Sequence, residues 1–304
     1  MRIFSREEVA RLAPYKAVIE ALRGAFRAEV TAPPRHHHTI ARQNADPMIY
    51  LLMPAWNRDY AGLKTVMVGG EPTVQANYLL YRKDTGESLA IMDGTEITQR
   101  RTACASALAA DYLARPDASR LLMVGAGVLS PHVVRAHAAV RPIREVQVYN
   151  RSRAKSEALV ADLTADGFAA SVADDLAAAT HWADVISCAT TSTTPIIEGR
   201  HIRPGTHVDL MGAFRPVMRE VDGETVKRAR VFVDTYEGAE SEAGDLLQAV
   251  AEGAFSMDRI IADLAKLCRG EMKGRQSGEE ITLFKSCGTA LEDLATAILI
   301  YEQA

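Results

Sequence analysis

The sequence has few of the features that mark extracellular, zinc-binding or membrane proteins. Its four cysteines (Cys104, Cys188, Cys268 and Cys287) are scattered, with neither a C-x-x-C pair nor a zinc-ligand spacing, so neither a disulfide scaffold nor a structural metal is expected. The N-terminus lacks the apolar run of a signal peptide, and no segment approaches the roughly 20 apolar residues of a membrane span. We therefore expect a reducing, cytoplasmic setting.

Strong charge and internal repetition are also missing. The net charge of −4 is too small to indicate a nucleic-acid-binding surface, and no repeat or low-complexity segment is present. Three consecutive histidines, His36 to His38, resemble a metal cluster. Neighbours on a strand point to alternate faces, however, so all three cannot bind one ion. No metal, nucleic acid or membrane is therefore expected as a partner.

The length and the pattern of apolar residues predict two domains. At 304 residues, with 48% hydrophobic and 24% charged residues, the chain exceeds the usual size of one domain and has ordinary globular composition. Its second part alternates short apolar runs with helical stretches, which is typical of a doubly wound parallel sheet. Strands are expected at 121–124, 145–149, 184–188, 206–210 and 230–233, and helices at 129–140, 152–166 and 240–251.

The first part of the chain predicts an antiparallel sheet behind N-terminal helices. Ser5 and Glu8 fit a capping box that opens a helix. Expected strands are 48–53, stopped by Pro54, then 62–68, and a hairpin of 77–82 with 88–92. An alanine-rich helix at 97–113 leads into the second part, and a last helix at 289–301 follows it. We expect an α/β protein: an N-terminal α+β domain, 1–115 with 289–304, and a Rossmann-type domain, 116–288.

A glycine-rich turn follows the first strand of the second part. The string Leu121-Leu-Met-Val-Gly125-Ala-Gly127-Val-Leu-Ser130 matches G-x-G-x-x-G with serine in place of the third glycine. Because a strand precedes it and a second strand follows at the right distance, it indicates a dinucleotide-binding turn, whose backbone N–H groups attract a pyrophosphate. Thr190, after the strand at 184–188, is expected to face the cofactor; a plain strand-end turn is the alternative.

The residues after the second strand favour a phosphorylated cofactor. An acidic residue there would accept bonds from a ribose 2′-hydroxyl, but this chain has Asn150, Arg151 and Ser152, followed by Arg153. An arginine and a hydroxyl suit a 2′-phosphate. NADPH is the expected cofactor, with NADH as the weaker alternative; two solvated arginines at a helix start are the other interpretation. Cofactor contacts are predicted at Gly125, Ala126, Gly127, Val128, Leu129, Asn150, Arg151, Ser152, Thr190, Met211 and Ser286.

Three cations before the glycine turn stand in unusual places. Lys64 lies inside an apolar strand, Arg101 at the start of the alanine-rich helix, and Arg35 at the head of an extended segment. A lysine in an apolar strand is unfavourable unless its ammonium is paired; a lysine that snorkels from an edge strand is the alternative. With no obvious acidic partners in the sequence, the three cations predict an anionic substrate, most simply a carboxylate, and His37 would share a face with Arg35.

These residues, in this order and spacing, resemble the ornithine cyclodeaminase/μ-crystallin family over nearly the whole chain. The resemblance implies a dimer in which antiparallel sheets of two first domains join. It also implies that Arg35, Lys64 and Arg101 hold a substrate carboxylate. We expect Arg35 and Arg101 to clamp that carboxylate and Lys64 to add charge and relay a proton, so Lys64 and Arg101 are the predicted catalytic residues. The matching pieces are Met53-Pro54-Ala55, Gly62-Leu63-Lys64, Met92-Asp93-Gly94, Ile97-Thr98, Arg101-Thr102-Ala103, the glycine turn, Asn150-Arg151-Ser152, Gly212-Ala213, Arg219-Glu220 and Glu280 to Ser286.

The resemblance also implies a reaction. Cyclodeaminases of this family rely on an aspartate after a Gly-Gly or Gly-Ala pair, and here Phe214 follows Gly212-Ala213. The local string is similar instead to ketimine reductases, so we expect an NADPH-dependent reductase of Δ1-pyrroline-2-carboxylate and Δ1-piperideine-2-carboxylate, with Phe214 packed against the ring. Alternatives are a cyclodeaminating lyase with Glu242 or Asp245 as its base, an alanine-type dehydrogenase, and a non-catalytic NADPH-binding protein.

Overall fold

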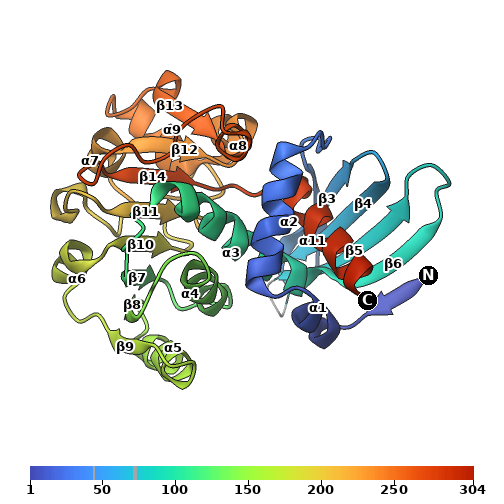
Figure 1. Cartoon of the computed structure of the whole chain (residues 1–304), viewed down its shortest axis with the longest axis horizontal. Coiled ribbons are helices and arrows are strands. Elements are labelled where there is room, and N and C mark those ends of the chain that lie inside the picture. The colour runs from blue at the N-terminus through green and yellow to red at the C-terminus, as the bar shows by residue number, and fades with distance from the viewer. Residues whose placement is uncertain (44, 71–73) are drawn as a thin grey trace. The chain divides into compact units, whose positions relative to one another are not determined.

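The computed structural model describes residues 1–43, 45–70 and 74–304 (Figure 1). The chain forms two compact units, Met1–Thr102 with Thr289–Ala304, and Ala103–Gly288. The boundary falls inside helix α3 (Gly94–Leu113), whereas the sequence placed it after that helix, at residue 115. Among the described residues, no helix combines the length and apolar character needed to cross a membrane.

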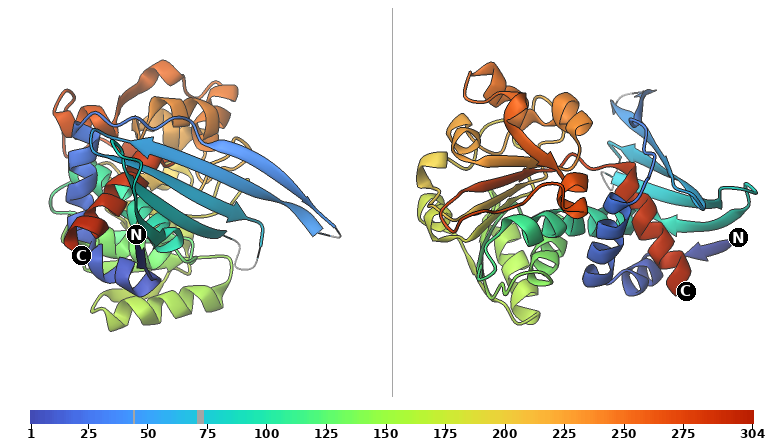
Figure 2. Two further views of the ribbon diagram at one scale, coloured as in Figure 1. Left: turned by 90° about the vertical axis from the view of Figure 1, so that its right-hand side faces the viewer. Right: turned by 45° about the horizontal axis from the view of Figure 1, so that its top comes forward.

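The first unit is a six-stranded sheet covered on one face by helices. The strand order is β1-β6-β5-β4-β3-β2, with β1 parallel to β6 and the other pairs antiparallel. Helices α2 and α11 lie side by side and α11 packs on β3, β4 and β5 (Figure 2). The elements are β1 (Arg2–Phe4), α1 (Arg6–Leu12), α2 (Tyr15–Arg27), β2 (His36–Arg42), β3 (Ala45–Trp56), β4 (Tyr60–Val68), β5 (Val74–Arg82), β6 (Ser88–Asp93) and α11 (Ala290–Gln303).

Local signals in this unit are confirmed, with one exception. Ser5 and Glu8 form the capping box on α1, and the hairpin of β5 and β6 is present. The prediction that Pro54 ends its strand is wrong, since β3 continues to Trp56. Pro54 pairs with Leu63 of β4, while the ladder to β2 ends at Leu52 opposite His36. The proline therefore sits where β3 has no β2 neighbour, a position that tolerates a missing N–H.

The second unit is an eight-stranded, wholly parallel sheet of the doubly wound type. Its order is β13-β12-β14-β11-β10-β7-β8-β9. The strands are β7 (Arg120–Val124), β8 (Glu145–Tyr149), β9 (Ala169–Val172), β10 (Val185–Cys188), β11 (His207–Leu210), β12 (Arg230–Val233), β13 (Ile260–Asp263) and β14 (Thr282–Lys285). The helices are α4 (Ser130–Ala138), α5 (Arg153–Ala165), α6 (Leu176–Trp182), α7 (Gly223–Arg228), α8 (Tyr236–Glu242), α9 (Gly244–Ala251) and α10 (Leu264–Arg269), with short 3-10 turns at Gly199–His201 and Met257–Arg259.

The Rossmann-type architecture is confirmed, and it has elements that the sequence pattern missed. β9, β13 and β14 were not expected. The single helix predicted at 240–251 is two helices, α8 and α9, because Ala243 leaves the helical conformation. The next residue, Gly244, packs against the chain so closely that a Cβ there would lie 2.0 Å from the Met218 carbonyl oxygen. That long-range contact has no signature in a local pattern.

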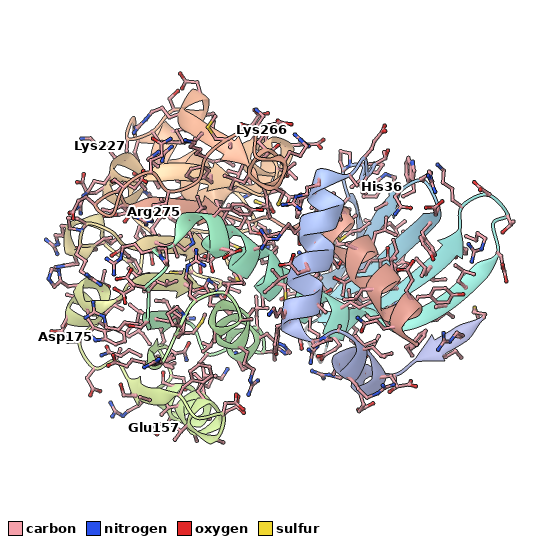
Figure 3. The ribbon with its side chains drawn as sticks, viewed as in Figure 1. His36, Glu157, Asp175, Lys227, Lys266 and Arg275 are labelled. Atoms are coloured by element: carbon pink, nitrogen blue, oxygen red, sulfur yellow. The ribbon has the colours of Figure 1, made fainter. Side chains whose placement is uncertain are left out.

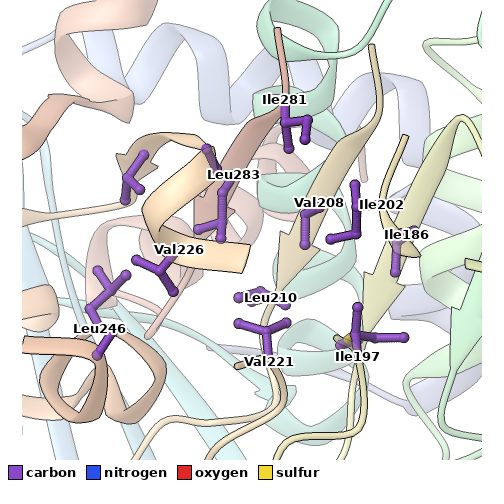
Figure 4. Packing of buried hydrophobic residues seen from close by; sticks show 14 of the residues in the cluster. Ile186, Ile197, Ile202, Val208, Leu210, Val221, Val226, Leu246, Ile281 and Leu283 are labelled. Atoms are coloured by element: carbon purple, nitrogen blue, oxygen red, sulfur yellow. The ribbon is translucent and has the colours of Figure 1, made fainter. Parts of the chain in front are cut away.

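The core of the second unit fixes the strand ends that carry the loops. Buried side chains from β11, β14, α7 and α9 meet in one cluster, which includes Leu210, Leu283, Val226 and Leu246 (Figure 4). Val221, from the chain between β11 and α7, belongs to the same cluster. Close packing of this kind leaves little freedom for the backbone, so the loops that follow β10 and β11 start from rigid supports.

Candidate active site

The glycine turn lies directly after β7, as expected. Gly125 has φ +110°, and a Cβ there would lie 2.7 Å from the Ala189 carbonyl oxygen, so only glycine fits. At Gly127 a Cβ would meet nothing within 4 Å, so the chain itself does not require this glycine. Val128, at the tip of the turn, is 75% exposed. The turn therefore presents open backbone to solvent, which is what an approaching phosphate needs.

Ser130 is more than a tolerated substitute for the third glycine. Its buried hydroxyl donates to the Gly125 carbonyl at 3.0 Å and accepts from the Gly127 N–H at 3.1 Å. One side chain thus closes the turn on itself at the start of α4. A glycine at this position would leave both backbone groups to find other partners.

The loop after β10 borders the glycine turn at the point where the strand order reverses. β7 lies between β8 and β10, and in open parallel sheets ligands bind at such a switch point, beyond the carboxyl ends of the strands. The Thr190 methyl group would be 3.3 Å from a Cβ at Gly125. Its N–H and its hydroxyl both donate to Glu220, at 2.7 and 2.9 Å. Thr190 is therefore held beside the glycine turn.

The other predicted cofactor residues lie at the same sheet edge. Met211 follows β11 and Ser286 follows β14, and both are buried. The Ser286 hydroxyl donates to Asp234 at 3.1 Å, so this serine also braces a neighbouring loop. Whether these two side chains touch a cofactor stays a prediction.

After β8, two arginines that are adjacent to Ser152 behave differently. Arg153 is tied to Glu157 at 2.9 Å and to Asp174 at 2.5 Å. Arg151 is exposed and has no ion pair or hydrogen bond within the described ranges. Asn150 donates to the Ser152 carbonyl at 3.1 Å, and the Ser152 side chain makes no capping bond to α5. Of the two arginines, Arg151 is thus the one with its guanidinium available for an anion.

In the first unit, two of the three predicted cations meet on one carboxylate. Lys64 donates to Asp293 Oδ1 at 2.7 Å, and its Nζ is also 2.7 Å from Oδ2. Arg101 donates to Asp293 Oδ1 at 3.1 Å and to Glu292 at 2.6 Å. Both acids come from α11 and are buried. The expectation that the cations lack acidic partners is therefore wrong, and it failed because the partners lie more than 190 residues away along the chain.

Lys64 does not snorkel. β4 is an interior strand of its sheet, and Lys64 faces the helix-covered side, where it is 1% exposed. Burial lowers the pKa of Lys64 to about 8; the nearby positive charges of Arg101 and Arg35 lower it further, and Asp293 opposes them. Arg35, just before β2, is thus within electrostatic reach of Lys64, which brings all three predicted cations into one neighbourhood.

The sequence analysis missed three described residues of this cluster, Glu292, Asp293 and Tyr78. Tyr78 of β5 pairs with Lys64 across the sheet, and its buried hydroxyl has no hydrogen-bond partner in the described part of the chain. A Cβ at Gly62 would lie 2.0 Å from that hydroxyl, which explains the glycine. The signal for Asp293 was present: two adjacent acids, Glu292 and Asp293, interrupt an otherwise apolar helix, and buried acids require partners.

Phe214 lies in the loop after β11 and is 43% exposed. Asp245, a candidate base in the lyase alternative, accepts from the Glu220 and Val221 N–H groups and lies 3.1 Å from Lys285 Nζ. It is fully buried, so its bonds are internal. His36 (Figure 3) and His38 are exposed on β2, and their ring centroids are 6.5 Å apart. Within the described residues, no group of three or more potential ligands is arranged around a metal site.

The chain is similar in sequence and in fold to known proteins. A Δ1-pyrroline-2-carboxylate reductase of Colwellia psychrerythraea is 36% identical, over 100% of this chain and 99% of the relative. The Δ1-pyrroline-2-carboxylate reductase of Thermococcus litoralis, solved with NADH and L-proline, superposes with a TM-score of 0.94 at 34% identity, covering 100% of this chain and 97% of that one. An archaeal alanine dehydrogenase dimer with bound NAD gives 0.92 at 32% identity, covering 100% and 96%.

The family model for the ornithine cyclodeaminase/μ-crystallin family matches residues 2–304. The resemblance carried by the short motifs thus extends over the whole fold, and the chain belongs to the ornithine cyclodeaminase/μ-crystallin family.

Proposed function

We propose that this protein is an NADPH-dependent reductase of cyclic ketimine carboxylates, which converts Δ1-pyrroline-2-carboxylate to L-proline and Δ1-piperideine-2-carboxylate to L-pipecolate. The observation that carries the proposal is the state of Lys64. An ammonium has three N–H donors, and the buried Lys64 uses one of them, on Asp293, among the described residues. Two donors in a cation-rich, buried site favour a carboxylate ligand.

The cofactor belongs to the second unit. A bound nicotinamide cofactor would supply the hydride that reduces the imine carbon. The glycine turn would hold its pyrophosphate, and Arg151, which has no partner among the described residues, would pair with a 2′-phosphate. NADPH is therefore proposed as the preferred cofactor and NADH as the weaker one. The named solved relatives contain NADH or NAD, so the preference for the phosphorylated form rests on Arg151.

The first unit would hold the substrate. Arg35, Lys64 and Arg101 would bind its carboxylate and fix the ring for attack on one face. Asp293 would orient the Lys64 ammonium and the Arg101 guanidinium before substrate arrives. Phe214, with an exposed ring, would pack against the planar imine and exclude water that would otherwise open it. A protonated Lys64 is also the nearest source of a proton for the ring nitrogen, directly or through water.

A second copy of the chain is the proposed partner. Pro54, Leu63, Leu79, Ile91 and Ile3 stand opposite one another on successive strands, on the sheet face away from Lys64 and the helices. Such an apolar row favours burial against another surface. The wild-type chain should have the mass of a dimer in light scattering, and Leu79→Arg should reduce that mass to a monomer's. An unchanged mass would exclude this face. The proposal includes a cytoplasmic setting, in which the four buried thiols stay reduced.

The test of the function is NADPH oxidation with a panel of imines. Five- and six-membered cyclic ketimine carboxylates should be reduced, and the product should be identified as proline or pipecolate. Pyruvate with ammonia should be a poor substrate. If pyruvate with ammonia were instead the best substrate, the alanine-type dehydrogenase would be the correct function, an alternative that the similarity to the archaeal alanine dehydrogenase keeps open. Tight NADPH binding without turnover of any imine would favour a non-catalytic protein.

A further inference from the structure

Glu220 lies where two loops at the carboxyl edge of the parallel sheet meet. Its Oε1 accepts from the N–H and the hydroxyl of Thr190, at 2.7 and 2.9 Å. Its Oε2 accepts from the N–H groups of Gly212 and Ala213, at 2.8 and 3.3 Å. Each carboxylate oxygen therefore holds a different loop: the one after β10 and the one after β11.

The two loops are also in direct contact, and glycine makes that contact possible. A Cβ at Gly212 would lie 2.2 Å from the Thr190 carbonyl oxygen and 2.4 Å from Glu220 Oε1. The loop after β10 in turn touches the glycine turn, through Ala189 and Gly125. Three neighbouring loops are thus linked: Glu220 holds two of them, and the third, the glycine turn, contacts the loop after β10. They follow the adjacent strands β11, β10 and β7.

The backbone at Glu220 is itself held in place by hydrogen bonds to a second buried carboxylate. Asp245 of α9 accepts from the Glu220 and Val221 N–H groups at 2.7 and 3.1 Å. Lys285, at the end of β14, lies 3.1 Å from the other oxygen of Asp245. All three charged side chains are fully buried. A buried carboxylate with four donors and a braced backbone is a preorganised unit, and it needs no solvent to complete it.

We propose that Glu220 is a positioning residue of the reductase, whose two oxygens set the spacing between the Thr190 loop and the Phe214 loop, where the reacting end of the cofactor would bind. This inference rests on the proposed function. Glu220 touches neither ligand in this account. It acts through the backbone of Thr190, Gly212 and Ala213, and Phe214 is the next residue along.

Protonation would open this arrangement. A neutral carboxyl group has a hydroxyl on one oxygen, which becomes a donor and accepts N–H bonds much more weakly than the carboxylate oxygen does. Burial and then the charge of Asp245 raise the pKa of Glu220 to about 7, while Lys285 and the Thr190 bonds favour the ionised form. Cys188 of β10 also interacts with the charge of Glu220, and burial raises the pKa of the Cys188 thiol well above its usual value. One of the two loops should therefore loosen below about pH 7.

Hydrogen exchange on the wild-type protein tests this without a variant and without activity. The amides of Thr190, Gly212 and Ala213 donate to Glu220. Their exchange rates are measured one pH unit above and one pH unit below the Glu220 pKa, and each rate is corrected for the intrinsic pH dependence of amide exchange. Protection of at least one of the two loops should fall at the lower pH, while amides of β7 keep theirs. Equal protection of both loops at the two pH values would overturn the proposal.

Kinetics of Glu220→Gln give the second arm, with Glu252→Gln as the matched control. Glu252 is half-exposed and pairs with Arg219, the neighbour of Glu220. Glutamine offers one acceptor oxygen and turns an N–H₂ group toward one loop. The kcat of Glu220→Gln should fall about 10- to 100-fold, which corresponds to the loss of one charge-assisted contact. The NADPH Kd should change much less, because the substitution does not alter the glycine turn. Glu252→Gln should resemble wild type.

The pH profile separates positioning from plain stability. Wild-type kcat/KM should fall as the pH drops below about 7, and this acid limb should be absent in Glu220→Gln. Glu220→Gln with wild-type kcat and an unchanged acid limb would refute the positioning role. If the wild-type protein reduced no ketimine, the proposed function would fail, and hydrogen exchange would still decide whether Glu220 holds the loops.

Discussion

Each unit of the molecule buries a lysine against an aspartate, and the pKa values of the two lysines are shifted in opposite directions. Lys64 and Asp293 are in contact at 2.7 Å, and Lys285 and Asp245 at 3.1 Å. Burial lowers the pKa of Lys64 to about 8, with help from neighbouring arginines. Burial acts the same way on Lys285, but Asp245, Cys287 and Glu220 outweigh it and raise the pKa.

The charged residues around each lysine–aspartate pair explain why the two pKa values shift in opposite directions. In the first unit a lysine and an arginine share Asp293, and a further arginine is near, so an added anion would be stabilised. In the second unit one lysine faces two acids, whose bonds hold loops in place. The first cluster has the electrostatics of a binding site, and the second has the electrostatics of a scaffold. The predictions below are ordered from the largest expected effect to the smallest.

Removal of Lys285 should be the more damaging to stability. Lys285→Met leaves Asp245 and Glu220 without their buried cation, and the free energy of unfolding should fall by about 3–5 kcal/mol. Lys64→Met should lower it less, because Arg101 still neutralises Asp293. Arg135→Met, which removes a partly exposed pair with Asp162 and Asp166, is the control, expected within about 1 kcal/mol. Urea unfolding measures all three, and a greater loss for Lys64→Met than for Lys285→Met would reverse the comparison.

Removal of Lys64 should instead be the more damaging to substrate recognition. Lys64→Met and Arg35→Ala should each lower kcat/KM for Δ1-pyrroline-2-carboxylate by about 10- to 100-fold, as expected for a lost charge-assisted contact. NADPH Kd, measured by fluorescence titration, should stay nearly constant in both variants, and this also checks that they fold. Wild-type efficiency in Lys64→Met would exclude Lys64 from the substrate site.

Arg151 should show the converse pattern in the second unit. Arg151→Ala should weaken NADPH binding by about 10- to 100-fold and NADH binding far less. Arg153→Ala is the matched control, since Arg153 is paired with Asp174 and Glu157 and should leave the ratio of the two Kd values unchanged. Equal losses for both cofactors in Arg151→Ala would remove the basis for the NADPH preference.

The alkaline limb of the pH profile should report the pKa of Lys64. If the protonated ammonium binds substrate, kcat/KM should fall as the pH rises through about 8. Asp293 favours the protonated form, so Asp293→Asn should move the limb to lower pH, by about one unit or more for a close opposite charge. A limb that stayed in place, or moved to higher pH, would show that Asp293 does not set the charge of Lys64.

How much of the structure the sequence predicted depends on how far apart in the sequence the interacting residues lie. The glycine turn, the alternation of strands and helices, and the Ser5 cap are local patterns, and all three are confirmed. Lys64 and Arg101 stood out because charge in an apolar segment is costly. Their joint partner Asp293 lies 229 residues from Lys64, and the role of Glu220 depends on three loops that meet only in the folded chain. Contacts at such separations leave no periodicity to detect.

The most direct test of the central claim is a comparison of two reactions in one preparation. Phe214 has no group that can take a proton from an amine, and removal of such protons is what a deaminating lyase requires of its base. The purified protein should oxidise NADPH with Δ1-pyrroline-2-carboxylate and form L-proline. It should release no ammonia from L-ornithine or L-lysine, even with NAD present. Catalytic ammonia release from L-ornithine coupled to proline formation, with no ketimine-dependent NADPH oxidation, would contradict the account and identify a lyase.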